Sequence, residues 1–415
     1  MLIKKKNMNF LSKNRLKLIF SFFLFIYIFA HLLFFKLGVL KSFNTDYTDP
    51  VLMLLDGNFS FINQNGELWN RGPFLYPLIL AFQLKLALIL NINALFITSI
   101  FSISVILFSG FILYKIARLF FFENYKHAQL TLILYLSIPF NIYSSSMPLS
   151  EIPFGLFVLL SIYYLLKGLL DFNKSKYFLL SGVTLGLALL IRPIGILLPL
   201  VYLLIIFSFF FKKYRKTAIL RMLFFSLAVS LTILPWSIYN YIKTDKVVLL
   251  ASNGVASIKD GLKLYHKGYR EKHEVSDDVK FVVDDFYQKR ETMNTLPVII
   301  DFLKDKFKED KWAVINFYLY KAKRVWYGLD SQNIKKEKII KIFSFLYIIL
   351  FMIALYKVFK RNDRKQIILL SIIILVTLTF WGMAILVVPL LRYVLLSYGL
   401  FTLLIPIILE KKLKV

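Results

Sequence analysis

The chain has 415 residues, of which 58% are hydrophobic and 17% aromatic, and its mean hydropathy is +0.67. Apolar runs near 20 residues recur along its whole length, which excludes a soluble globular protein and predicts an all-α polytopic membrane protein. The net charge of +28 does not indicate nucleic-acid binding, because Lys and Arg form short runs between apolar spans, and the absence of Cys excludes disulfides and thiolate chemistry.

About ten transmembrane helices are predicted, and the charge distribution selects that number. They cover 18–39, 94–114, 128–147, 152–170, 177–191, 193–211, 222–240, 341–356, 367–391 and 393–409. With both chain ends inside, the inner segments hold 25 Lys and Arg, whereas the short outer segments with their flanks hold six. This positive-inside bias, with Lys/Ile/Phe/Asn-rich usage, predicts a bacterial cytoplasmic (inner) membrane protein. The first span lacks a small-residue cleavage site after it, so we expect a retained helix.

These spans divide the chain into three parts. Residues 1–240 form a transmembrane module that contains the first outer loop, 40–93. Residues 241–340 form an extracytoplasmic loop domain of mixed charge, and 341–415 hold the C-terminal helices. Within the first outer loop, the stretch 74–92 is apolar but is interrupted by Pro, Gln and Lys, so we predict a helix at the membrane interface rather than a span.

The first outer loop carries carboxylates directly after the first span. Asp46 and Asp49 lie there, and a carboxylate beside apolar walls can act as a general base. The alternative is that these residues are merely solvated, or that Asp49 caps a helix whose first residue is Pro50. Asp56-Gly57 is typical of a turn.

Cations and one further carboxylate are predicted on the same outer face. Arg192 lies at a tight outer turn between two short apolar segments, and Arg392 repeats the arrangement at the outer end of the last helix pair. An Arg at such a turn should face a polar cavity or an anion rather than lipid. Arg can bind phosphate through two parallel hydrogen bonds. The alternative is that both side chains extend to the lipid headgroups. Arg71 and Lys85 add cations, and Glu151 either belongs to the site or stabilises the start of the fourth helix, which Ser150 could cap.

The sequence contains no pattern for a metal or a nucleotide. The four His residues are scattered without metal-ligand spacing, and no Gly-rich phosphate loop is present. No cofactor is therefore evident. A donor usable at the outer face would be a lipid phosphate, held by Arg while its headgroup is transferred.

Five motifs in chain order resemble those of the GT-C class of membrane glycosyltransferases, specifically the family-39-like group of protein mannosyltransferases and lipid A aminoarabinose transferases. They are Asn70-Arg71-Gly72-Pro73-Phe74-Leu75-Tyr76-Pro77-Leu78; Leu149-Ser150-Glu151; Gly182-Val183-Thr184-Leu185-Gly186-Leu187-Ala188 with Arg192-Pro193; Pro235-Trp236-Ser237-Ile238-Tyr239-Asn240; and Arg392-Tyr393. The likeness spans nearly the whole chain. One departure is Tyr239, which stands where the family usually has Arg.

The resemblance implies inverting transfer of a sugar from a polyprenyl-phosphate donor to a glycan, lipid or protein acceptor at the outer face. It makes Asp46 the expected base, although the spacing to Asp56-Gly57 is shorter than usual and leaves Asp49 as a competitor. Arg71, Lys85, Glu151, Arg192, Arg392 and Tyr393 are the expected substrate-binding residues. Some enzymes of the class use a divalent metal, which nothing in this sequence demands.

Two other classes remain open on the sequence alone. An O-antigen-type polymerase or ligase also uses polyprenyl-linked sugars, but would place its main catalytic residues in the later outer loop. A lipid or solute transporter would need ionisable residues in the middle of helices. The predicted spans are largely free of these, apart from His31.

Overall fold

A computed structural model describes residues 2–37, 47–62, 68–69, 72–121, 125–171, 174–264, 275–329, 331 and 333–410, with side chains except those of 2–13 and 211–213. Most of these residues are helical, and no strand occurs among them beyond one isolated bridge between Ile62 and Leu68. The all-α membrane class predicted from composition is confirmed by this architecture and by its long apolar helices.

The helices follow one another in this order: α1 (Leu2–Lys36), α2 (Thr48–Leu55), α3 (Leu75–Leu90), α4 (Ala94–Phe120), α5 (Tyr125–Leu136), α6 (Pro139–Ser144), α7 (Glu151–Leu170), α8 (Lys176–Leu189), η1 (Pro193–Gly195), α9 (Leu198–Thr244), α10 (Gly254–Leu262), α12 (Asp277–Lys289), α13 (Leu296–Glu309), α14 (Lys311–Arg324), α15 (Ile334–Arg361), α16 (Arg364–Leu386), η2 (Leu391–Tyr393), α17 (Leu395–Phe401) and η3 (Ile405–Leu409). Helix α9 turns back at Tyr214, whose backbone is not helical, so it consists of two helices in succession.

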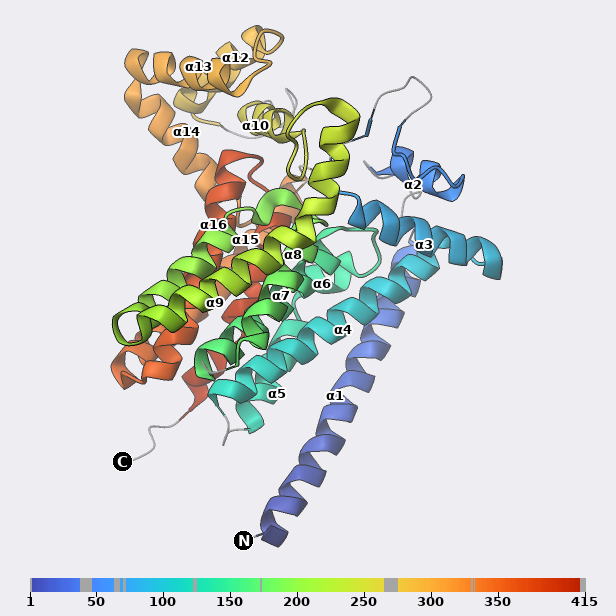
Figure 1. Cartoon of the computed structure of the whole chain (residues 1–415), viewed down its shortest axis with the longest axis vertical. Coiled ribbons are helices and arrows are strands. Elements are labelled where there is room, and N and C mark those ends of the chain that lie inside the picture. Colours follow the sequence, from blue (N-terminus) through green and yellow to red (C-terminus); the bar gives the residue numbers. More distant parts are fainter. Residues whose placement is uncertain are drawn as a thin grey trace.

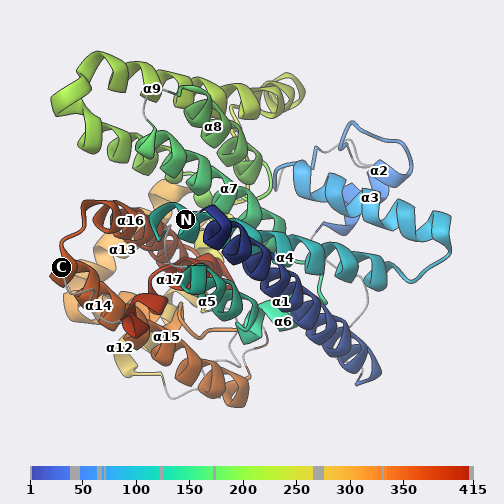
Figure 2. The same cartoon turned by 90° about the horizontal axis from the view of Figure 1, so that it is seen from below.

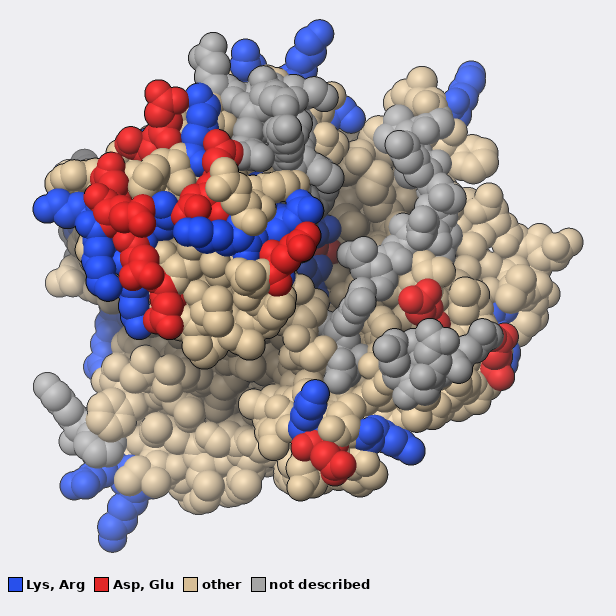
Figure 3. Space-filling model, turned by 90° about the horizontal axis from the view of Figure 1, so that it is seen from above, with Lys and Arg blue, Asp and Glu red and all other residues tan. Residues whose placement is uncertain are grey.

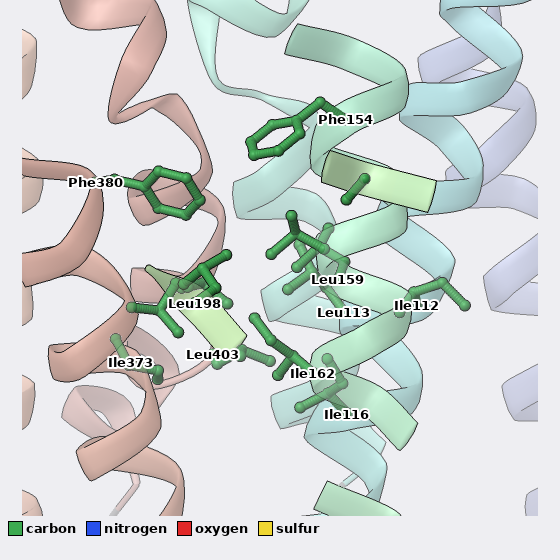
Figure 4. Close-up of a cluster of buried hydrophobic side chains, with 14 of the residues drawn as sticks. Ile112, Leu113, Ile116, Phe154, Leu159, Ile162, Leu198, Ile373, Phe380 and Leu403 are labelled. Carbon is green, nitrogen blue, oxygen red and sulfur yellow. The ribbon is translucent and has the colours of Figure 1, made fainter. Parts of the chain in front are cut away.

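Helix α7 lies in the middle of the bundle, between α8 and α4, and the second half of α9 covers α8 (Figures 1 and 2). Figure 4 shows the core between α4, α7 and α16, where Leu113, Ile162 and Ile373 are fully buried. Near the upper end of this core the rings of Phe154 and Phe380 meet edge to face, with centroids 5.8 Å apart. The core therefore fixes the start of α7 against α16.

Small residues let α8 and α9 approach closely. A Cβ atom at Gly182 would lie 2.5 Å from the carbonyl oxygen of Phe225, and one at Gly186 would lie 2.6 Å from the Cβ of Thr232. Spacing of four residues puts both glycines on one face of α8, as at small-residue interfaces between membrane helices. The Gly-x-x-x-Gly motif is thus a packing surface that fixes the C-terminal end of α8. Arg192 comes shortly after this end in the chain.

In the described part of the chain, seven helices are long and apolar enough to cross a membrane: Asn14–Lys36, Ala94–Phe120, Glu151–Leu170, Pro193–Phe210, Tyr214–Thr244, Ile334–Arg361 and Arg364–Leu386. Each coincides with a predicted span. The remaining three predicted spans coincide with shorter helical pieces, so the count of ten is not confirmed.

The three shorter pieces have identifiable causes. Span 128–147 is divided into α5 and α6, because Pro139 begins a new helix and removes a backbone donor. Span 177–191 corresponds to α8, whose 14 residues extend only about 21 Å at 1.5 Å per residue. Span 393–409 is divided into η2, α17 and η3, with Pro406 at the start of the last. A hydropathy window does not resolve such interruptions.

The first outer loop contains two described helices. Helix α2 begins at Thr48 with Tyr47 at the N-cap position, so Asp49 lies in the first turn and is not the cap that the sequence suggested. A carboxylate at this position still interacts favourably with the helix dipole. The predicted turn at Asp56-Gly57 is confirmed, since Gly57 has φ +78°. The predicted interfacial helix 74–92 corresponds to α3, which lies beside α2 at one end of α4 (Figure 1).

Helices α10, α12, α13 and α14 lie within the segment 241–340, which the sequence predicts to be extracytoplasmic, and we call them the outer helical domain after that prediction. They surround a second buried cluster that includes Val282, Phe286, Phe302 and Phe317. Acidic and basic side chains alternate over its surface (Figure 3), as in the pairs Lys280–Asp277 and Lys304–Asp301. Exposed pairs of this kind add little stability, so the buried cluster holds this domain together.

The outer helical domain and α2–α3 lie at one end of the molecule (Figure 1). The first turns of α1, the turn inside α9 at Tyr214 and the turn between α15 and α16 lie toward the other end. The basic residues of these turns thus lie at the end away from the two long loops, as the positive-inside bias requires.

We therefore expect residues 241–340 to be extracytoplasmic. A reporter fused after about residue 300 should be active only if it is an enzyme that works outside the cytoplasm. A reporter fused at the α15–α16 turn should be active only if it works inside the cytoplasm. A cytoplasmic signal at residue 300 would contradict this orientation and move the candidate active site to the inner face.

Candidate active site

Glu151, the first residue of α7, accepts contacts from two arginines that are distant in sequence. The Nη1 atom of Arg192 lies 2.6 Å from Glu151 Oε1, and the Nε atom of Arg392 lies 3.4 Å from the same oxygen. The exposed fractions of the side chains are 7% for Glu151, 14% for Arg192 and 23% for Arg392. Both arginines are thus turned onto one buried carboxylate. This is not the extended conformation expected of side chains that reach for headgroups.

Two further side chains complete this group. Arg192 Nη1 also donates to the hydroxyl of Ser150 at 2.7 Å. The ring of Tyr393 lies near both guanidinium groups, 5.2 Å from Arg192 and 5.3 Å from Arg392, measured from each Cζ to the ring centroid. A ring at this distance attracts a cation. We call Glu151, Arg192, Arg392 and Tyr393 the arginine cluster.

Local sequence explains how each member is presented. Ser150 stands at the N-cap position of α7 without making a side-chain cap bond, so its hydroxyl is available to Arg192. Pro193 disfavours helical backbone in the residue before it, and Arg192 accordingly has φ −146° and ψ 126°. The chain leaves α8 at this point and turns the arginine toward α7. Arg392 lies in the short helix η2, shortly after Pro389.

The arginine cluster lines a cleft that opens between α4, α7 and η2. Ser109, Tyr135 and Asn141 contribute polar atoms to its walls, and the rest of the lining is mainly aliphatic. The cleft offers ≈ 40 Å³ to the centre of a water-sized sphere. One water needs about 10–15 Å³ on this measure, so there is room for a few waters beside the charged groups. A cleft of this kind, apolar with a few convergent charges, is typical of a ligand site.

The first outer loop reaches the arginine cluster through α3. The amide of Leu75 donates to the carbonyl of Leu190 at 3.2 Å, which joins the start of α3 to the end of α8. Tyr76 follows, and its ring meets that of Tyr47 with centroids 4.9 Å apart. Both phenols are close enough to Arg192 to interact with its charge. The described start of α2 and the start of α3 thus lie in the same region as the cluster.

A second contact joins the first outer loop to α9. Trp236 packs against Phe61 and Phe74, with ring centroids 5.8 Å and 5.4 Å apart. Its Nε1 donates to the carbonyl of Leu250 at 2.9 Å. The Pro-Trp motif of the sequence is thus a structural support for the loop, and Tyr239 stacks on the same tryptophan.

The predicted site residues fall into three groups. Glu151, Arg192, Arg392 and Tyr393 are brought together. Asp49 and Lys85 are exposed on α2 and α3, and neither lines the cleft. Asp46 and Arg71 lie outside the described residues.

Sequence reasoning missed Tyr135 and Asn141. An Asn inside an otherwise apolar stretch was the available signal, and in the structure it is buried and donates to the carbonyl of Tyr135.

No group of three or more His, Asp or Glu side chains that could hold a metal ion occurs among the described residues. The arginine cluster has one carboxylate between two guanidinium groups, and this arrangement suits an anion better than a cation.

A family model described as dolichyl-phosphate-mannose-protein mannosyltransferase matches residues 90–250. That family is a member of the GT-C class, so the match confirms the resemblance to GT-C membrane glycosyltransferases with lipid-linked donors. The matched residues run from the end of α3 through α9 and include Glu151 and Arg192, whereas residues 40–89 of the first outer loop and Arg392 lie outside them. No curated protein and no solved structure matches the chain.

Proposed function

On the premise that residues 90–250 form a GT-C glycosyltransferase segment, we propose that the chain transfers a sugar, with inversion, from a polyprenyl-phosphate donor to an acceptor outside the cytoplasmic membrane. The acceptor would be a glycan, a lipid or a protein. The observation that carries this proposal is the convergence of Arg192 and Arg392 on Glu151 beside a cleft.

The charges of the arginine cluster suit this donor. Two guanidinium groups and one carboxylate leave a net charge of +1. A polyprenyl-phosphate sugar is a phosphodiester and carries one negative charge. Each guanidinium has five N–H donors, so contact with Glu151 leaves others for a phosphate oxygen. Glu151 would then be a positioning residue that holds both arginines in place before the donor arrives.

The same charges would assist the reaction. The acceptor oxygen attacks the anomeric carbon, the bond from that carbon to the phosphate oxygen breaks, and its electron pair stays on the phosphate. The leaving polyprenyl phosphate therefore gains negative charge while the acceptor proton passes to a carboxylate. Fixed cations placed where charge develops lower the barrier without further reorganisation. We propose Asp46 as the general base that accepts this proton, with Asp49 as the alternative base, and we place the sugar near Tyr393. Arg71 and Lys85 remain proposed contacts to the lipid.

Donor consumption by the purified protein tests this proposal. In proteoliposomes that contain an envelope extract as acceptor, labelled sugar should be transferred from polyprenyl monophosphate donors and not from nucleotide sugars. Transfer only from lipid-linked oligosaccharide pyrophosphates would favour the polymerase or ligase class. Movement of intact lipid across the bilayer without cleavage of the sugar would favour a transporter.

A further inference from the structure

The segment 386–391 connects the end of α16 to η2, which carries Arg392. Its carbonyl oxygens point to helix α14 of the outer helical domain. Lys321 Nζ donates to the carbonyl of Val387 at 3.0 Å and approaches that of Leu386 at 3.5 Å. These carbonyls are at the C-terminal end of α16, where a cation is favoured by the helix dipole.

A second basic side chain holds the same segment one turn along α14. Arg324 Nη1 donates to the carbonyl of Pro389 at 3.1 Å, and its Nη2 pairs with Glu337 Oε1 at 3.1 Å. Arg324 is completely buried and Glu337 nearly so. The amide of Leu391 completes the arrangement by donating to the carbonyl of Gly328 at 2.9 Å. The backbone is thus held by hydrogen bonds at residues 387, 389 and 391, and the last of these directly precedes Arg392.

Backbone also touches backbone at this contact. A Cβ atom at Gly261 of α10 would lie 1.6 Å from the carbonyl oxygen of Val387, and one at Gly328 would lie 2.6 Å from that of Pro389. Neither position can accept a larger residue unless the segment moves. The contact therefore depends on the path of segment 386–391 itself.

Burying Lys321 is costly, which argues that this contact has a purpose beyond covering apolar surface. Burial lowers the pKa of the Lys321 amine to about 7, although amine and ammonium alike retain N–H groups to donate to Val387. A polar group that loses water must recover its hydrogen bonds inside the protein. An apolar side chain would cover α16 at lower cost but could not hold carbonyl oxygens in place.

We propose that the outer helical domain positions Arg392 for the donor phosphate, with Lys321, Arg324 and Gly261 acting through segment 386–391. These are positioning residues, since they contact the segment and not the cleft. The proposal rests on the proposed function, because it requires Arg392 to bind the donor. It gives the outer helical domain a part in donor binding although its helices do not line the cleft.

Two pairs of matched variants test the contact. Gly261→Ala places a methyl group against Val387, whereas Gly254→Ala, on the same helix, meets nothing within 4 Å. Lys321→Met removes the donor, whereas Lys323→Met alters an exposed residue of the same helix. We expect Gly261→Ala and Lys321→Met to raise the Kd of polyprenyl phosphate about threefold to tenfold, the range for one or two lost hydrogen bonds. The two controls should leave it unchanged, and Lys321→Arg should restore part of the loss.

Combination with Arg392→Ala separates positioning from general destabilisation. If Lys321 acts through Arg392, the double variant Lys321→Met/Arg392→Ala should bind polyprenyl phosphate as well as Arg392→Ala alone. The comparison requires that the two variants have equal thermal stability in detergent. The proposal would be overturned if Lys321→Met raised the Kd by the same factor in the Arg392→Ala background as in the wild type. It would also be overturned if Gly261→Ala and Lys321→Met both left the Kd unchanged. If Arg392→Ala alone binds as well as the wild type, the proposed function fails first and this inference fails with it.

Discussion

Asp46→Asn should abolish sugar transfer while the protein is still produced and still binds its donor. An acceptor hydroxyl is a poor nucleophile until its proton is withdrawn, and a positioned general base contributes about 10²–10⁴-fold to the rate. Asn keeps the size and hydrogen bonding of Asp but cannot accept the proton. The single-turnover rate with preloaded donor is the direct measurement, because it isolates the chemical step from binding.

Asp49→Asn is the matched control, since it makes the same chemical change three residues along. Asp49 is exposed in the first turn of α2. Its loss should remove only a favourable interaction with the helix dipole, about 0.3–1 kcal/mol, and leave most of the activity. Full activity in Asp46→Asn with loss in Asp49→Asn would make Asp49 the base. Full activity in both would exclude the two carboxylates from catalysis.

Arg192→Ala and Arg392→Ala should each weaken donor binding by roughly tenfold or more. A hydrogen bond to a charged group contributes about 1.5–3 kcal/mol, and in each variant one guanidinium that faces the phosphate is lost. Arg192→Ala should be the more damaging, because it also leaves Ser150 and Glu151 without their contacts at 2.7 Å and 2.6 Å. Titration of the purified variants with polyprenyl-phosphate sugar measures the effect.

Lys243→Ala provides the charge-matched control, because Lys243 is an exposed cation in the last turn of α9 and does not line the cleft. Its donor affinity should be close to that of the wild type. Wild-type affinity in both arginine variants would indicate that these side chains serve the lipid headgroups and not the donor.

The sequence predicted that Arg192 and Arg392 face a polar cavity or an anion, because each lies at a tight turn close to the apolar interior. Arg192 directly precedes Pro193, and Arg392 follows Pro389 by three residues. What it could not predict was their partner. Glu151 precedes Pro153 at the start of a helix, a position where a carboxylate is ordinarily explained by the helix dipole.

Other features were missed or had no signal in the sequence. The stretches 128–147 and 393–409 are apolar enough to be taken for single spans, and Pro139 and Pro406 were the available signals for their division into short helices. Lys321 and Lys323 are equally basic neighbours on α14, and only the fold decides that the first is buried against Val387. The connection between the outer helical domain and Arg392 depends on contacts such as that of Arg324 with Pro389, which lie 65 positions apart in the sequence.

Binding of polyprenyl phosphate without any sugar tests the central claim most directly, since it requires neither the sugar nor the acceptor to be known. The wild-type protein should bind polyprenyl phosphate and should bind the uncharged polyprenol of equal length far more weakly. Arg192→Ala and Arg392→Ala should each remove most of this preference, and Lys243→Ala should keep it. Equal binding of the phosphate and the alcohol by the wild-type protein would contradict a phosphate site at the arginine cluster.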